Sequence, residues 1–225
     1  MCRRLLTIFI LSVMLAPIYA KAASEEDNKG LTAEKCFKEA PGSVLGLIAP
    51  NTRLDMIDYY SAGIDKDSQN TTGGPCRITD MQDYSITFTG GNGIEYQMFV
   101  LNPNGTTPVI GLIQTIDTPI PDSQLILYRT DWNIIPTPNA KALGGEPDFT
   151  AWVKPAHIKD ISTISEQVPF VMAKYTYHPE TSSLTAQNNM DKYFVNDDTP
   201  ETMSMLKDTI TYKWQPKAMA FFPEK

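Results

Sequence analysis

The chain has 225 residues, of which 42% are hydrophobic and 20% charged, and a formal net charge of −7. This length suffices for one good-sized domain or two small ones, and the apolar fraction lies far above the disordered range. Three cysteines and two histidines exclude a disulfide-dense scaffold and a four-cysteine metal centre. The balance of 19 Lys and Arg against 26 Asp and Glu argues against a nucleic-acid partner, because such a partner selects a basic surface.

Residues 1–22 have the pattern of a secretory signal peptide. Two arginines precede an apolar run over residues 5–18, and Ala20-Lys21-Ala22 supplies a small–x–small cleavage site, with cleavage after Ala20 as a second option. The run is shorter than a comfortable bilayer span, although an uncleaved anchor is the alternative. No later segment is long and apolar enough to cross a membrane. We therefore predict an exported protein, periplasmic or associated with the cell surface, with a flexible leader over residues 23–31.

Signal cleavage also changes the cysteine count. It removes Cys2 and leaves Cys36 and Cys76, an even pair in an oxidising compartment. A disulfide between them would close a loop of about 40 residues and stabilise the fold by roughly 4 kcal/mol in the chain-entropy model. Two buried free thiols are the alternative. Neither cysteine has the sequence neighbours of a catalytic nucleophile.

Two helices are expected ahead of any strand. Thr32 caps the first helix, which ends before Pro41-Gly42. The second helix opens at Pro50, with Thr52 and Asp55 as a variant of the capping box. Its apolar residues recur at helical spacing, and they are Leu54, Ile57 and Tyr60.

Beyond Gly73-Gly74 the apolar pattern changes from helical to alternating. Short turns separate four predicted strands, at residues 84–89, 94–100, 109–116 and 124–129. The first of these turns is the hairpin turn Gly90-Gly91-Asn92-Gly93. In the first of them, Ser85, Thr87 and Thr89 point away from the apolar side chains. The third is apolar almost throughout, as expected of a central strand covered on both faces. These strands predict an antiparallel meander.

Residues 136–147 hold three prolines and a Gly-Gly pair and form the candidate internal boundary. An alternating segment follows at residues 171–178, and a turn leads from it to the segment 183–187. A helix starts at Thr199-Pro200, and a final strand covers residues 210–214. Helices followed by consecutive hairpins predict an α+β fold, with N-terminal helices packed on a mainly antiparallel sheet. We predict a single domain over residues 32–225.

The segment Asn51–Tyr60 resembles the signature of a secreted Bacteroidales family that is known only as a domain of unknown function. Thr130–Asn133 and Ile210–Trp214 are similar to other parts of its pattern, so the resemblance covers residues 32–216. Gln215-Pro216 departs from the Asn/Asp-Gly turn expected after the last tryptophan. The resemblance implies export in an anaerobic gut-type bacterium and assigns no catalytic residues.

Two pairs of residues are candidates for a functional role. Asp55 and Asp58 lie three residues apart on one side of the predicted helix, where two carboxylates can share a metal or act as acid and base; the alternative is a solvated helix face. Asp131 and Trp132 follow a strand, where a tryptophan beside polar groups can stack on a sugar or contact a protein. The alternative there is a turn stabilised by Asp131, with Trp132 packed on the sheet.

Other patterns give no site. His157 and His178 lack metal-ligand spacing, and His178 is expected to lie exposed on a strand. The glycine-rich segments lack the strand–glycine–helix order of a phosphate loop, and no serine-hydrolase motif is present. We predict no catalytic, cofactor or metal site. Asp208-Thr209-Ile210 fits an O-glycosylation pattern of exported proteins in that bacterial group, which a mass shift absent from Thr209→Ala would test.

The sequence thus predicts an exported envelope protein that acts as a non-catalytic binding or interaction module, with an envelope protein or a glycan as partner. One alternative is a hydrolase that uses Asp55, Asp58 or Asp131, and a cleft shared by these carboxylates would favour it. Another is an inhibitor or assembly factor of the envelope, which would expose a large apolar or aromatic patch on one sheet face.

Overall fold

Two helices begin the part of the chain that the computed structural model describes, which is residues 30–117, 119–139, 141–143, 149–194 and 198–224. Helix α1 (Ala33–Glu39) is capped as predicted, because the Thr32 hydroxyl accepts the Lys35 N–H at 3.2 Å. Helix α2 (Pro50–Ser61) starts directly on Pro50. The predicted signal peptide and most of the leader lie outside the described residues.

Two details of α2 were predicted wrongly. The capping box is absent, because Ala49 precedes the helix and the Thr52 hydroxyl instead donates to the Gln69 carbonyl at 3.3 Å. The buried stripe consists of Arg53, Met56 and Ile57, whereas the apolar residues Leu54 and Tyr60 are 48% and 37% exposed. The helical spacing was predicted, but the buried face of the helix includes Arg53 in place of its neighbour Leu54.

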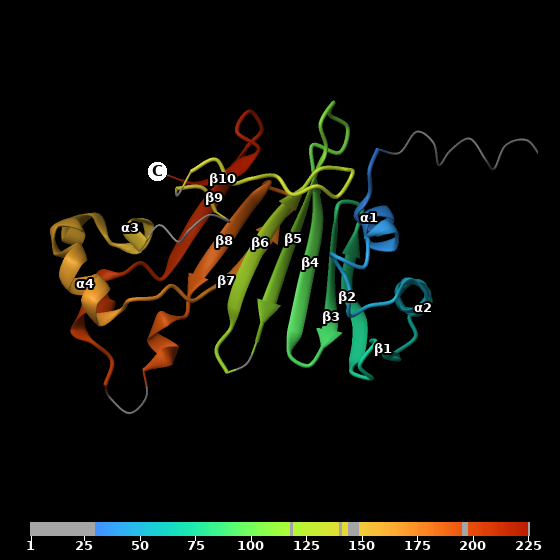
Figure 1. Cartoon of the computed structure of the whole chain (residues 1–225), viewed down its shortest axis with the longest axis horizontal. Coiled ribbons are helices and arrows are strands. Elements are labelled where there is room, and N and C mark those ends of the chain that lie inside the picture. The colour runs from blue at the N-terminus through green and yellow to red at the C-terminus, as the bar shows by residue number, and fades with distance from the viewer. Residues whose placement is uncertain (1–29, 118, 140, 144–148, 195–197, 225) are drawn as a thin grey trace, which may run out of the picture. The chain divides into compact units, whose positions relative to one another are not determined.

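An antiparallel sheet of six strands follows in chain order (Figure 1). Its strands are β1 (Ser68–Gln69), β2 (Pro75–Gln82), β3 (Ser85–Gly91), β4 (Ile94–Leu101), β5 (Val109–Ile116) and β6 (Asp122–Tyr128). The predicted meander is confirmed as β3 to β6. Strand β2 was missed because a register shift between Ile78 and Asp80 interrupts its alternation.

One face of this sheet shares a core with the helices. Phe37 of α1 lies against Phe88 of β3 with ring centroids 4.6 Å apart, and Phe88 stacks on Tyr96 of β4. Met56 of α2 belongs to the same buried cluster. The Ala33 N–H donates to the Asp83 carbonyl at 2.9 Å, so α1 is also tied to the turn before β3.

A second antiparallel sheet has the order β10-β9-β8-β7. Its strands are β7 (Ala173–His178), β8 (Ser183–Asn188), β9 (Thr209–Gln215) and β10 (Ala220–Pro223). The first three were predicted. Strand β10 was not, because Met219 with φ of 48° closes its hairpin in place of the expected Asn/Asp-Gly turn.

Short helical segments connect and flank the second sheet. They are α3 (Phe149–Trp152), η2 (Pro155–Asp160), α4 (Ile161–Gln167), η3 (Met190–Tyr193) and η4 (Glu201–Met205). The helix predicted at Thr199-Pro200 is η4, a single 3₁₀ segment with Pro200 as its N-cap. The segments over residues 149–167 were not predicted, since none is long enough to show a helical period.

The second sheet covers part of the other face of the first. Phe99 of β4 stacks on Tyr177 of β7 with centroids 3.8 Å apart, and both contact Phe221 of β10. Strand β5 contributes to both cores through Ile110 on one face and Ile113 on the other, so the prediction of a covered central strand is confirmed. No helix among the described residues is long and apolar enough to cross a membrane.

The α+β class and the antiparallel sheet of consecutive hairpins are thus confirmed. Residues 31–225 form one compact unit. The chain passes from the first sheet to the second between Tyr128 and Ala173, and part of the candidate boundary at residues 136–147 lies outside the described residues.

Candidate functional site

The face of the first sheet that meets the second sheet is half polar and half apolar. Directly paired residues of antiparallel strands project to the same side, so the register defines three rows of side chains. The rows are Arg77–Thr89–Glu95–Thr115–Ser123, Asp80–Thr87–Gln97–Ile113–Leu125 and Gln82–Ser85–Phe99–Gly111–Leu127. The apolar residues of β4 to β6 join the core with the second sheet. The members on β2 and β3 are polar in every row.

Strand β7 forms a wall at the border between these halves. As an edge strand it would expose backbone donors, but side chains of the first sheet accept from alternate N–H groups along it. The bonds are Ala173 N–H to Asp122 Oδ1 at 3.0 Å, Tyr175 N–H to Ser123 Oγ at 3.0 Å, and Tyr177 N–H to Gln97 Oε1 at 2.8 Å. These three N–H donors of the β7 edge are therefore satisfied without a neighbouring strand.

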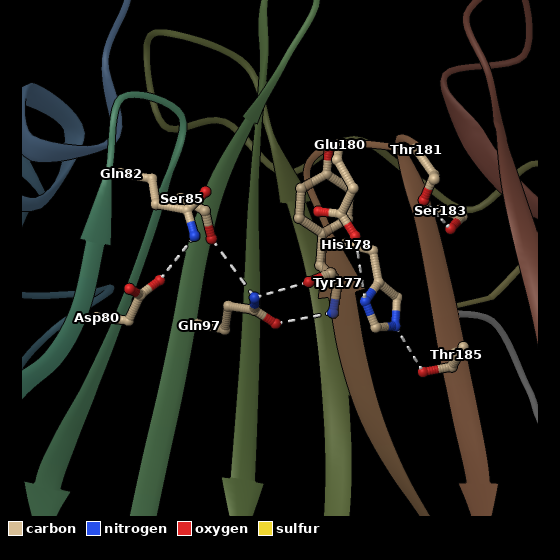
Figure 2. Close-up of polar contacts among 10 residues, drawn as sticks. All are labelled: Asp80, Gln82, Ser85, Gln97, Tyr177, His178, Glu180, Thr181, Ser183 and Thr185. Carbon is tan, nitrogen blue, oxygen red and sulfur yellow. Dashed lines mark hydrogen bonds and ion pairs between the residues drawn. The ribbon is translucent and has the colours of Figure 1, made fainter.

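Gln97 makes the most specific of these contacts. Its amide also donates from Nε2 to the Tyr177 carbonyl at 2.9 Å, so it pairs with both backbone groups of one residue, as a strand would (Figure 2). Ser85 Oγ lies 3.4 Å from the same Nε2. The position of β7 over the sheet is consequently fixed by a side chain from β4.

A cavity of about 80 Å³ lies in the corner between the sheet and β7, and we call it the polar groove. It is lined by Thr87, Glu95, Gln97, Ile113, Thr115, Tyr175 and Thr176. Lys174 Nζ lies 3.4 Å from Glu95 Oε1, and both side chains are partly exposed. Hydroxyl and amide groups and one ion pair therefore meet in a shallow site that is open to solvent.

His178 continues the polar surface beyond the groove. Its Nε2 lies 3.1 Å from Thr185 Oγ1, and its Nδ1 lies 3.8 Å from Glu180 Oε1 (Figure 2). The order hydroxyl, imidazole, carboxylate is that of a nucleophilic triad. However, 3.8 Å is too long for the hydrogen bond that orients the imidazole in such a triad. His178 is half-buried beside Thr185, which differs from the exposed position that the sequence predicted.

The predicted pair Asp55 and Asp58 is exposed on α2 and does not line the groove. Asp55 acts electrostatically on Lys66, whose pKa is raised first by the hydrogen bond to the Tyr59 hydroxyl. That hydrogen bond is 2.9 Å long, and Lys66 Nζ also lies over the Tyr59 ring. Asp55 thus belongs to a surface cluster at the end of α2.

Asp131 and Trp132 lie in the turn after β6. Asp131 accepts hydrogen bonds from the backbone N–H of Asn133 at 3.1 Å and from its side chain at 2.8 Å. These bonds, led by the backbone one, lower the pKa of Asp131. Trp132 has φ of 65°, is half-buried and lies 5.8 Å from the Tyr128 ring. Neither side chain reaches the polar groove.

Cys36 and Cys76 are buried and free in the structure. Burial, the largest cause, raises the pKa of Cys36 from 9.0 to about 12 and that of Cys76 to about 11. Thiols in this state are poor nucleophiles. The predicted disulfide stays a prediction. Across the described residues, no group of three His, Cys, Asp or Glu side chains is placed to hold a metal ion.

Arg53 has a role that the sequence did not reveal. Its side chain is 1% exposed, and the guanidinium donates to four backbone carbonyls, of Ile48, Phe37, Lys38 and Ala40, at 2.5–3.2 Å. Three of these carbonyls are at the end of α1. The available signal was the helical spacing of Arg53, which lies three residues before Met56 and four before Ile57.

The groove residues were missed for a different reason. Ser85, Thr87 and Thr89 were correctly predicted to point away from the apolar side chains of β3, but β7 alone determines which polar side chains lie beside a wall. That strand follows β3 by more than eighty residues, and nothing local to either strand indicates their contact.

These observations define a two-sheet α+β protein with a polar groove at the border of the sheets. Residues 28–219 match the family described as protein of unknown function (DUF3256), and the chain belongs to that family. The predicted resemblance to a family of unknown function is therefore confirmed, whereas the assignment of Asn51–Tyr60 as its signature stays a prediction.

A solved structure has a similar fold. It is that of a domain of an uncharacterized protein from Porphyromonas gingivalis W83, with a TM-score of 0.65 and 19% sequence identity over 85% of this chain and 98% of that chain. No curated protein matches the chain.

Proposed function

We propose that this protein is an exported module of the bacterial envelope that binds a partner in the polar groove and catalyses no reaction. The observation that carries the proposal is the polar groove, where the Glu95–Lys174 ion pair and the hydroxyls of Thr87 and Thr176 meet at one cavity beside β7. The uncovered half of the sheet face is polar as the solvated face of an antiparallel sheet is, so the groove, and not the polarity of that half, supports binding. The signal-peptide pattern of residues 1–22 supports export.

A carboxylate-dependent hydrolase has less support. Asp55 and Asp58 are exposed on α2, Asp131 holds its own turn, and none of the three lines a cavity described here. Within the groove, the carboxylate of Glu95 lies 3.4 Å from Lys174 Nζ, and no second carboxyl group lines the cavity to act with it. The geometry therefore supports binding better than acid–base chemistry.

An inhibitor or assembly factor of the envelope would need a broad apolar or aromatic sheet face. The outward face of the second sheet instead carries polar side chains in register, including the row Thr176–Thr185–Thr211. This composition suits a polar ligand better than a hydrophobic protein surface.

Photo-cross-linking in intact cells tests the proposed function. Benzoylphenylalanine is placed at Thr176, which is exposed on the groove wall, and in a matched strain at Ser61, which is exposed at the end of α2. We expect a cross-linked adduct from Thr176 and none from Ser61. Equal adducts at both positions, or none at Thr176, would contradict a binding role for the groove.

A further inference from the structure

We infer that the ligand of the polar groove is an uncharged carbohydrate, bound through its hydroxyl groups; this inference rests on the proposed function. Three features of the groove carry it: the balance of charge, the occupied edge of β7, and the free hydroxyls of its threonines.

The charges of the groove cancel within it. Glu95 lines the groove, and its charge is neutralised by Lys174, whose Nζ lies 3.4 Å from it at the rim; the other lining residues are threonines, Gln97, Ile113 and Tyr175. An anionic ligand would meet Glu95, and a cationic ligand would meet Lys174. An uncharged ligand avoids both repulsions and can still use the pair, since the ammonium donates to one hydroxyl while the carboxylate accepts from its neighbour.

The edge of β7 is closed to peptides. An extended peptide binds a sheet edge through its main-chain groups, which need free N–H and C=O partners on the edge strand. Here the N–H groups of Ala173, Tyr175 and Tyr177 already donate to side chains of the first sheet. The Tyr177 carbonyl is likewise occupied by Gln97. A peptide ligand would therefore find none of these three N–H groups free, and the paired ladder of an added strand could not form.

Two threonine hydroxyls remain available to a ligand. The structure gives the hydroxyls of Thr87 on the floor and Thr176 on the wall no hydrogen-bond partner among the described residues, although both residues line the groove. By contrast, the hydroxyl of Thr115 is paired with that of Ser123 at 2.8 Å. Each free hydroxyl can both donate and accept, which matches the hydroxyls of a sugar.

The size of the groove indicates a chain rather than a single sugar. Its volume of about 80 Å³ is well below the roughly 300 Å³ at which pockets enclose a small ligand. One edge of a sugar ring can enter while the neighbouring units lie along the open polar rows of β2 and β3. We therefore expect oligosaccharides to bind more tightly than the corresponding monosaccharides.

Calorimetric titration of the purified protein tests this inference. The probes are the neutral pentasaccharides of β-1,4-glucose, α-1,4-glucose, mannose and N-acetylglucosamine, with a galacturonate oligomer and an uncharged Ser/Thr/Ala peptide as the charged and peptide comparisons. We expect at least one neutral oligosaccharide to bind. Thr176→Val, which removes the hydroxyl but keeps the shape, should weaken that binding about five- to tenfold, the effect of one hydrogen bond.

The matched control is Thr211→Val on β9, in the same row of the second sheet but outside the groove, and its affinity should change by less than about twofold. Melting curves establish that both variants are folded. Preferred binding of the galacturonate or the peptide, or equal effects of the two substitutions, would overturn the inference. If no neutral sugar binds while the adduct at Thr176 persists in cells, the carbohydrate assignment fails and the proposed function stands. If neither sugar binding nor the adduct is found, both the carbohydrate assignment and the proposed binding function fail.

Discussion

Arg53 shows how a single buried cation can organise the start of this fold. Its four carbonyl partners include three at the C-terminal end of α1, where the helix dipole is negative. Burial lowers the pKa of Arg53, but the guanidinium stays charged because arginine is not deprotonated in proteins. The contact links α1, the turn before α2, and α2 itself.

Replacing Arg53 by lysine should therefore lower the free energy of unfolding by about 3–5 kcal/mol, because an ammonium cannot reproduce the planar fork and would leave buried carbonyls unpaired. Urea unfolding followed by circular dichroism measures the change. The exposed Arg129 gives the control, and Arg129→Lys should alter stability by less than about 0.5 kcal/mol. A small effect at Arg53 would mean that water replaces the guanidinium at these carbonyls.

Gln97 carries the link between the two sheets at the residue scale. Gln97→Leu would leave the Tyr177 N–H and C=O groups without partners, at a cost of about 2–4 kcal/mol in the free energy of unfolding. Hydrogen exchange of the Tyr177 amide should accelerate, because its protection comes from Gln97 Oε1. Gln124→Leu, an exposed position on β6, is the matched control. Unchanged exchange at Tyr177 would refute this role of Gln97.

At the scale of elements, the β3–β4 hairpin is the part that the sequence predicted best. Asn92 and Gly93 have φ of 56° and 73°, as a two-residue Asn-Gly turn requires. Local turn chemistry and alternation agree there, so no distant contact is needed to define the hairpin. Strands β2 and β10 were missed because these local signals are absent. A bulge interrupts the alternation of β2, and Met219, rather than Asn or Gly, has the positive φ in the turn before β10.

The hairpin gives a test at this scale. Gly93→Ala places a side chain at positive φ and should cost about 1–2 kcal/mol. Gly42→Ala is the control, because an added Cβ there meets nothing within 4 Å and its φ is not positive. Thermal or urea unfolding of both variants checks the difference. Equal stability of the two would show that the turn tolerates a different conformation.

At the scale of the whole molecule, buried acids make the fold sensitive to alkaline pH. Burial raises the pKa of Cys36 and Cys76 above 9.0, and that of Tyr96, Tyr128, Tyr175 and Tyr177 above 10.0. Below pH 9 these groups are protonated in both states, so their contribution to stability is complete. Above it the unfolded chain releases protons that the folded chain retains, and stability falls.

We therefore expect the free energy of unfolding to be level from pH 7 to 9 and to decrease between pH 9 and about 12, where Cys36 titrates in the folded state. Each buried thiol contributes up to about 1.4 kcal/mol per pH unit within its own window. Urea unfolding at intervals of pH measures the slope, and Cys36→Ala should reduce it. A slope unchanged by that substitution would exclude Cys36 as a source.

The same two thiols report on the compartment. In the folded protein neither should react with iodoacetamide at pH 8, since both are buried and protonated. In denaturant without reductant, one adduct on each of Cys36 and Cys76, detected by intact mass, would show that both thiols are free, as they are in the structure. An absence of adducts on these two residues would instead establish the disulfide that the sequence predicted, and an N-terminus at Ala23 would establish signal cleavage.

The sequence by itself determined the elements whose information is local. The Thr32 cap, the Asn-Gly turn and the alternation of β3, β4, β7 and β9 depend on residues close to one another in the chain, so their patterns survive in one dimension. The prediction against metal-rich and nucleic-acid-binding classes likewise depends on composition alone, and it stays a prediction. Arg53 was predicted only in part: the sequence places it on a helix, but it does not indicate the carbonyl partners on α1.

Only the tertiary structure decided the groove. The alternation of β3 predicts that Thr87 faces away from Phe88, but it cannot tell whether the second sheet covers that face. The wall of β7 depends on Gln97, Ser123 and Asp122, whose partners lie some fifty to eighty residues away in the chain. Contacts at that separation leave no periodic trace in either segment. For this reason the sequence described the polar side chains, and the packing of the two sheets made them a site.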